Sequence, residues 1–311
     1  MARAVVLGGA GFLGSHLCDA LLSRGDEVIA IDNFSSGSKS NLQHLVGERR
    51  FSLVEADICT ELDVNVKVDI VLNFASPASP KKYLTMPLQT LKTGSVGTEN
   101  AIQLALKNKA RLVMASTSEV YGDPLVSPQT EEYFGNVNPI GVRSCYDEAK
   151  RFSEALLMAH SRVSNLNLGI ARIFNTYGPR LDPHDGRVVS TIIDQAIKGE
   201  DLTIHGDGSQ TRSFCFVDDL IRGIVALVDS RELGPINLGN DNEMSVLQLS
   251  ELVRKIAGSS SKVRFTSAMD DDPQQRCPDL TLAKTKLGWS PQVSVEDGLR
   301  KTIDWFKGSQ K

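Results

Sequence analysis

The sequence predicts an α/β protein with a Rossmann-type doubly wound parallel sheet and a smaller mixed α/β lobe. Three observations predict this fold. A short apolar strand at residues 4–7 leads through a glycine-rich turn into a helix. Apolar strands then alternate with helices as far as residue 178, which requires a parallel sheet covered by helices on both faces. Beyond that residue the expected elements are shorter and mixed.

The glycine-rich turn carries Gly8, Gly11 and Gly14 between the strand at 4–7 and a helix expected at 15–24. Glycines permit a tight turn and a close approach of the backbone to a ligand. A pyrophosphate can therefore lie on the N–H groups at the positive end of the helix. A glycine-rich loop without a ligand is the alternative, and the strand and helix on either side favour a dinucleotide.

The second strand, at 27–31, ends in Asp32. At that position the 2′-hydroxyl of a bound ribose would need an acceptor, whereas a 2′-phosphate would be repelled by the carboxylate. We therefore expect the cofactor to be NAD rather than NADP. A solvated carboxylate at the strand end is the alternative reading of Asp32.

Further strands are expected at 51–56, 68–75 and 112–115, with a loop at 76–87 and a helix at 88–108. The small residues after the fourth strand would let a cofactor lie against the strand end. Lys92, Thr93 and Asn100 of the helix face either the cleft or solvent, and we expect Lys92 and Asn100 to bind substrate. The other residues expected around the cofactor are Phe12, Leu13, Asn33, Asp57, Ile58, Phe74, Ala75, Ser76, Thr93, Ala115 and Thr176.

Tyr146 and Lys150 are four residues apart on an expected helix, so they share one face. An ammonium near a phenol favours the phenolate, and we expect the pKa of Tyr146 to be lowered toward neutrality. Thr117, at the end of the strand at 112–115, can hydrogen-bond the oxygen that Tyr146 deprotonates. The alternative is that the pair has no catalytic role, because in many helices such a tyrosine only packs against the core and such a lysine is only a solvated surface residue.

The part of the chain after residue 178 is expected to form a smaller lobe. We divide the chain into a sheet domain at 1–178, with a return segment at 213–239, and a substrate-binding lobe at 179–311. In order, we expect a helix at 188–198, strands at 202–205 and 214–217, a helix to 228 capped by Asp218, a strand at 235–238, a helix at 246–257 capped by Ser245, and a last helix at 296–306.

Composition excludes several classes of protein. The chain has 311 residues, of which 41% are hydrophobic and 23% charged, and its net charge is −4. It has no dense basic run, so we expect no nucleic-acid partner. The five scattered cysteines form no Cys-x-x-Cys pair and indicate a reducing, cytoplasmic location. We expect no membrane segment and no targeting segment, because no apolar run approaches the required length. We expect no metal site, because the histidines lack a spacing suited to a metal.

Several longer stretches of the sequence resemble a known protein family. The glycine turn, Asp32, the Ser116–Ser118 strand end and the tyrosine–lysine pair are similar to the extended short-chain dehydrogenase/reductase superfamily, which acts on nucleotide sugars. Within it, the chain resembles the UDP-glucuronate decarboxylase family through the strings at 116–124, 137–141, 146–148, 172–180, 185–190, 208–212 and 272–276. One departure is Gly94, where the family usually has asparagine.

The resemblance implies roles for named residues. Tyr146 would be the base and Lys150 its partner and a ribose ligand, while Thr117, Ser118 and Glu119 would surround the reacting sugar. The remaining implied groups, which would hold the diphosphate or the sugar acid, are Asn175, Arg187, Arg212 and Arg276. The resemblance also implies a homodimer.

Ser118 bears on the reaction. Related sugar 4,6-dehydratases carry an aspartate at this point, which helps to expel a hydroxyl, and a serine cannot do so. The implied reaction is NAD-dependent decarboxylation of UDP-glucuronate to UDP-xylose and CO2 through a 4-keto intermediate, with the cofactor recycled. The alternatives are a UDP-hexose 4-epimerase on the same fold and a non-catalytic NAD-binding sensor.

Overall fold

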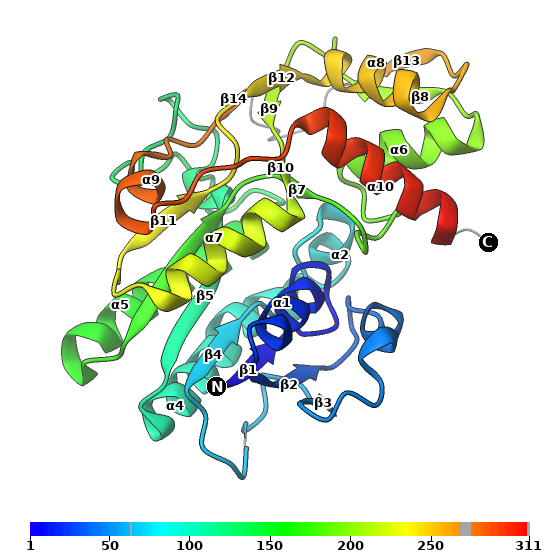
Figure 1. Cartoon of the computed structure of the whole chain (residues 1–311). Coiled ribbons are helices and arrows are strands. Elements are labelled where there is room, and N and C mark those ends of the chain that lie inside the picture. Colours follow the sequence, from blue (N-terminus) through cyan, green and yellow to red (C-terminus); the bar gives the residue numbers. More distant parts are fainter. Residues whose placement is uncertain (63, 268–274, 310–311) are drawn as a thin grey trace.

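A seven-stranded parallel sheet forms the centre of the protein in a computed structural model that describes residues 1–62, 64–267 and 275–309 (Figure 1). The strand order is β11-β6-β5-β4-β1-β2-β3, and every neighbouring pair is parallel. The strands are β1 (Arg3–Leu7), β2 (Glu27–Asp32), β3 (Phe51–Glu55), β4 (Ile70–Asn73), β5 (Arg111–Thr117), β6 (Leu168–Ile173) and β11 (Pro235–Leu238). The predicted fold class is confirmed.

Side chains alternate between the two faces of this sheet, and both faces are buried. Ala4 and Val6 of β1 face α1 (Phe12–Ser23) and α7 (Val217–Asp229), while Val5 and Leu7 face α4 (Thr98–Asn108) and α5 (Ser144–Ser164). Figure 1 shows α1 and α7 together on the near side of the sheet. Because helices cover both faces, a ligand is expected outside the carboxyl ends of the strands, where parallel α/β sheets bind their ligands.

The lobe is built from α6 (Val188–Lys198), α8 (Val246–Ala257), α10 (Val295–Ser309) and the strand pair β8 (Leu202–His205) and β13 (Val263–Thr266). Its apolar side chains, such as Ile192 and Leu249, belong to the same hydrophobic cluster as the near face of the sheet. Short strands join the two parts, namely β7 (Thr176–Tyr177), β9 (Thr211–Ser213), β10 (Cys215–Phe216), β12 (Glu243–Ser245) and β14 (Gln275–Arg276).

The return segment contributes both α7 and β11, and β11 pairs with β6 as the edge strand of the sheet. The division of the chain at residue 178 stays a prediction. It was drawn from the change in element length along the sequence, whereas the hydrophobic core runs across it without a break.

Two local predictions were wrong. The expected loop at 76–87 contains α2 (Pro80–Thr85). The expected helix at 88–108 is present as α3 (Pro87–Lys92), a π-helical turn η2 (Thr93–Gly97) and α4, which follow one another directly. Asp218 is not a cap, because Phe216 is the extended N-cap residue of α7. Asp218 instead lies in the first turn, where an acidic side chain favours the helix dipole. The remaining elements are η1 (Lys39–Leu45), η3 (Ser118–Tyr121) and α9 (Thr281–Leu287).

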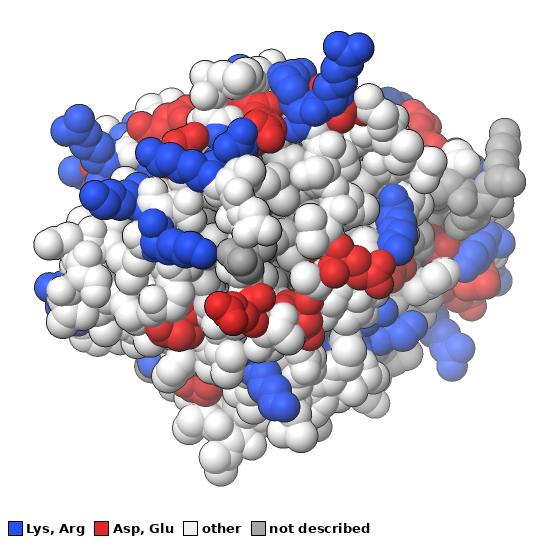
Figure 2. Space-filling model, turned by 90° about the horizontal axis from the view of Figure 1, so that it is seen from below, with Lys and Arg blue, Asp and Glu red and all other residues white. Residues whose placement is uncertain are grey.

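Surface charge is mixed on the face that Figure 2 presents, where basic and acidic side chains are interspersed around uncharged surface. In the described ranges, no helix combines the length and the apolar character needed to cross a membrane.

The predicted cap of α8 is confirmed and gives a stability test. Ser245 accepts a hydrogen bond from the Gln248 N–H at 3.1 Å, and the Gln248 side chain accepts one from the Ser245 N–H at 2.8 Å. Losing a serine cap costs about 1 kcal/mol. We expect Ser245→Ala to lower the melting temperature by about 2 °C. Ser164→Ala, an exposed serine at the end of α5, is the control, and equal melting temperatures would contradict the role of the cap.

Candidate active site

A cavity of about 450 Å³ opens at the carboxyl ends of β1, β4, β5 and β6, between the sheet and the lobe. The glycine turn and the ends of β5 and β6 line one side of it, and α2, α6 and the short strands line the other. A second, smaller cavity lies beside it at the ends of β2 and β3. The two cavities meet at Gly8, Gly11, Phe74 and Ser76, so one extended ligand can occupy both.

The glycine turn leaves no room for side chains. Gly8 has a φ of +78°, which favours glycine, and a Cβ at Gly14 would lie only 2.0 Å from the Gly8 carbonyl oxygen. Gly11 is the N-cap of α1 and has no side chain to bond the first-turn N–H groups. These N–H groups and the positive end of α1 fit the pyrophosphate of a dinucleotide.

Asp32 lies at the end of β2 and is buried, with 7% of its surface exposed. Its carboxylate accepts hydrogen bonds from the N–H groups of Ala10 at 2.9 Å and Phe34 at 2.8 Å. Burial raises the pKa of Asp32, and these N–H groups oppose that shift. The carboxylate fixes the glycine turn to the loop after β2, and each oxygen keeps a second lone pair for a ribose hydroxyl.

All the residues predicted around the cofactor line one of the two cavities. The larger cavity holds Gly8, Gly11, Phe12, Leu13, Gly14, Phe74, Ser76, Ala115, Tyr146, Lys150 and Thr176. The smaller one holds Asp32, Asn33, Asp57, Ile58, Ala75 and Thr93. Within it, the Asn33 amide donates to the Asp57 carboxylate at 3.1 Å. The residues present therefore fit a dinucleotide.

Tyr146 and Lys150 are both buried on the face of α5 that meets the end of β5. Lys150 Nζ donates to the Ala115 carbonyl at 2.8 Å and lies 5.8 Å from the centre of the Tyr146 ring. Burial lowers the pKa of Lys150 to about 8, so it is mostly an ammonium at neutral pH. The structure thus brings together the two groups that the sequence predicted as partners.

The predicted direction of the Tyr146 pKa was wrong. Burial raises it to about 12, while the hydrogen bond with Thr117 and the positive charge of Arg187 lower it. The phenol is therefore protonated at neutral pH in the protein itself. A phenolate at this position needs further cationic stabilisation, such as a ligand can bring.

Glu119 is held between two guanidinium groups. Arg276 contacts both carboxylate oxygens, at 2.6 and 2.9 Å, and Arg143 donates at 2.7 Å. Burial alone would raise the pKa of Glu119, but the two arginines outweigh it and lower the pKa to about 2. Glu119 is therefore a poor general base, and its interaction with Arg276 ties β14 to the end of β5.

The predicted substrate ligands divide into two groups. Asn175, Arg187, Arg212 and Arg276 line the larger cavity. Lys92 and Asn100 do not: Lys92 is exposed on α3, and the Asn100 amide donates to the carbonyl groups of Ile58 and Thr60 at 2.8 Å. Asn100 thus holds the loop after β3, and both predictions are corrected. Asp272, Pro273 and Gln274 lie outside the described residues.

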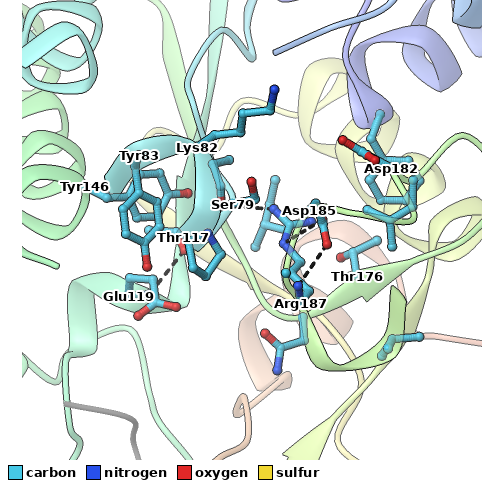
Figure 3. A pocket seen from close by; sticks show the side chains of 18 of the residues that line it. Ser79, Lys82, Tyr83, Thr117, Glu119, Tyr146, Thr176, Asp182, Asp185 and Arg187 are labelled. Carbon is cyan, nitrogen blue, oxygen red and sulfur yellow. Dashed lines mark hydrogen bonds and ion pairs between the residues drawn. The ribbon is translucent and has the colours of Figure 1, made fainter. Parts of the chain in front are cut away.

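The sequence did not single out several residues that the structure places in the cavity. These residues are Arg143 and, labelled in Figure 3, Ser79 at the N-cap of α2, Lys82 and Tyr83 of α2, and Asp185. Asp185 accepts from the Arg187 N–H at 2.9 Å, and the Arg187 guanidinium donates to the Ala78 carbonyl at 3.0 Å. The proline after Ser79 was the available signal for α2, because proline favours the first position of a helix.

Gly94 is explained by close packing of η2 on α5. A Cβ at this position would lie 2.7 Å from the Cβ of Ala149, which directly precedes Lys150. Ser153 donates to the Gly94 carbonyl at 2.6 Å. The glycine therefore lets the two helices approach, and a larger side chain here would displace α5.

The chain is similar in sequence to known proteins over most of its length. Residues 4–239 match the model of the NAD dependent epimerase/dehydratase family. The chain belongs to that family. It is 49% identical over 305 residues to UDP-glucuronic acid decarboxylase 1 of Xenopus tropicalis, which covers 98% of this chain and 72% of the relative. A relative of the same name in Arabidopsis thaliana is also 49% identical, covering 98% of this chain and 70% of the relative.

Solved structures from this NAD dependent family share the whole fold. UDP-glucose 4-epimerase from Thermotoga maritima has a TM-score of 0.92 at 30% identity, with 99% of this chain and 100% of that chain covered. UDP-glucuronic acid 4-epimerase from Bacillus cereus, in complex with UDP-glucuronic acid and NAD, has a TM-score of 0.84 at 29% identity and covers 99% of both chains. The family resemblance of the sequence is confirmed. In the described part of the chain, no group of three potential ligands could hold a metal ion.

Asp147 provides a test of the electrostatics beside Tyr146. Burial and the negative charge of Glu119 raise its pKa to about 7, although Arg143 lowers it. The folded state thus holds this proton more tightly than the unfolded state, so stability falls as pH rises from about 4 to 7. We expect Asp147→Asn to remove this dependence. The melting temperature of the variant minus that of the wild type should be larger at pH 8 than at pH 5. The same difference at both pH values would contradict the shifted pKa.

Proposed function

We propose that this protein is a UDP-glucuronate decarboxylase that uses bound NAD and forms UDP-xylose and CO2. The observation that carries the proposal is the arrangement of Tyr146, Thr117 and Lys150 at the end of β5, beside a cavity that also presents Arg187, Arg212 and Arg276. The similarity of 98% of this chain to relatives named UDP-glucuronic acid decarboxylase supports this substrate and reaction.

Tyr146 is the proposed base at the C4 hydroxyl of the sugar. Thr117 lies beside the Tyr146 hydroxyl, so two oxygen atoms are available where the C4 hydroxyl can bind. When bound across the glycine turn, NAD supplies the oxidation at C4 and the later reduction of the C4 ketone. Tyr146 takes the C4 proton in the first step and returns it in the last. Asp32 favours NAD over NADP, because it would repel a 2′-phosphate.

Loss of CO2 follows from the 4-keto sugar acid. The bond between C5 and the carboxylate breaks, and its electron pair moves into the C4 carbonyl to give an enolate. Hydrogen bonds from Tyr146 and Thr117 to the C4 oxygen stabilise this charge. A proton that comes from water is then added at C5, where the carboxylate was bound. The buried Ser118 fits this reaction, because no hydroxyl has to be expelled and no acid is needed at that position.

The arginines suit an anionic substrate. Guanidinium groups bind phosphate and carboxylate through paired hydrogen bonds. Arg187 lies near Tyr146, since its charge lowers the pKa of that phenol, and it belongs to the sugar end of the cavity. Arg276 forms an ion pair with Glu119. To contact the substrate, its guanidinium must either bind both groups at once or leave Glu119.

An epimerase is the second candidate function. It is favoured by the solved structures of UDP-glucose 4-epimerase and UDP-glucuronic acid 4-epimerase described above, at 30% and 29% identity. The decarboxylases are more similar in sequence, at 49% identity. A cytoplasmic location and a homodimer are also part of the proposal, supported by the free cysteines and by the family resemblance.

The product distinguishes the two candidates. We expect incubation with UDP-glucuronate and NAD to release CO2 and UDP-xylose without net consumption of NAD. NADP should support the reaction poorly. The measurement is a nuclear magnetic resonance spectrum of the nucleotide sugars together with CO2 detection. Formation of a 4-epimer with no CO2 would establish the epimerase instead.

Tyr146→Phe tests the base. The variant keeps the ring and its packing and removes the hydroxyl, so the rate should fall by about 10²–10⁴-fold while NAD affinity and melting temperature stay near wild type. Near-normal turnover would assign the base to another group. Loss of NAD binding and stability together would show that Tyr146 acts only in packing.

A further inference from the structure

Helix α2 and its N-cap contribute two residues with buried hydroxyl groups to the lining of the larger cavity. Ser79 is its N-cap residue and Tyr83 follows four residues later, so both lie on one face of the helix. Ser79 is 6% exposed and Tyr83 is 2% exposed, and both line the cavity. Figure 3 shows both on the same side of the cavity, with the rings of Tyr83 and Tyr146 stacked.

Neither hydroxyl oxygen has a hydrogen-bond partner among the described residues. Ser79 does not even cap its own helix, although an N-cap serine usually accepts a first-turn N–H. A third hydroxyl on the same helix behaves differently, because Thr85 Oγ1 donates to the Lys81 and Lys82 carbonyls at 2.9 Å. A buried polar group without a partner costs free energy, and a ligand that supplies the missing bonds removes that cost.

The position of Tyr83 indicates which part of a ligand it meets. Its ring is stacked on that of Tyr146, with centroids 5.1 Å apart and planes 8° apart. Cys145 Sγ donates to the Tyr83 carbonyl at 3.6 Å and holds α2 against α5. The reacting carbon lies at Tyr146, so a group stacked on Tyr146 lies beside the reacting ring and not beside the distant nucleotide.

The hydroxyl groups of Ser79 and Tyr83 are suited to bind the uncharged hydroxyl groups of a sugar. Hydroxyl groups of serine and tyrosine both donate and accept, which matches the hydroxyls of a sugar ring. Burial raises the pKa of Tyr83 far above its ordinary value, so its hydroxyl stays a neutral donor. The anionic parts of a nucleotide sugar have stronger partners in the arginines and the glycine turn.

We propose that Ser79 and Tyr83 bind hydroxyl groups of the glycosyl ring and position it against Tyr146. The proposal rests on the function given above and makes α2 the element that distinguishes the sugar from the nucleotide. Tyr83 acts here as a positioning residue, since it orients the ring whose C4 proton Tyr146 removes.

Tyr83→Phe and Ser79→Ala test this role with two ligands. We expect each variant to raise the KM for UDP-glucuronate by about 3–10-fold, the worth of one uncharged hydrogen bond. Inhibition by UDP, which lacks the sugar, should stay at the wild-type level. The melting temperature of Tyr83→Phe should be equal or higher, because the variant removes a buried hydroxyl without a partner. Thr85→Val is the matched control on the same helix and should change none of these values.

Three results would overturn the inference: an unchanged KM, UDP inhibition weakened as much as UDP-glucuronate binding, or a melting temperature that falls together with binding of both ligands. The second would assign the hydroxyls to the nucleotide, and the third would assign them to packing. If the wild-type protein forms a 4-epimer and no CO2, the proposed reaction fails, but the comparison of UDP with UDP-glucuronate still decides whether α2 binds the sugar.

Discussion

The hydrogen bond from the buried Lys150 ammonium to the Ala115 carbonyl is the contact on which the site depends. A buried ammonium without partners is costly, so α5 is held where this bond can form. The same position places Tyr146 against Thr117, and it packs α5 so closely on Gly94 that a Cβ there would press on Ala149. One charged contact between helix and strand therefore sets both the proton acceptor and the packing of the helix beside it.

Electrostatics divide the cavity into distinct regions. The glycine turn offers N–H groups at the end of α1, the lobe offers arginines, and α2 offers uncharged hydroxyls. Glu119 is withdrawn from acid–base chemistry by its two guanidinium partners, which leaves Tyr146 as the titratable group beside Thr117. This separation is what allows one cleft to hold a diphosphate, a sugar acid and a dinucleotide in a single orientation.

Much of this arrangement could be predicted from the sequence because it depends on local patterns. The order of strands and helices, the glycine turn, Asp32 and the Tyr146–Lys150 pair each follow from spacing along the chain. The sequence could not place Asn100 or the Arg276–Glu119 ion pair, since both depend on segments that meet only in the fold. It also could not give the pKa of Tyr146, because burial outweighs the nearby charges and burial is a property of the whole structure.

The shared hydrophobic cluster has a consequence for how ligands reach the site. Side chains of the lobe, such as Ile192 and Leu249, lie in one continuous core with Ala4 and Val6 of the central sheet. A hinge that swung the lobe away would expose this apolar surface to water, which is unfavourable in proportion to the area exposed. Local displacement of segments at the rim of the cleft exposes less apolar surface than such a hinge, so it is the less costly way to admit a nucleotide sugar.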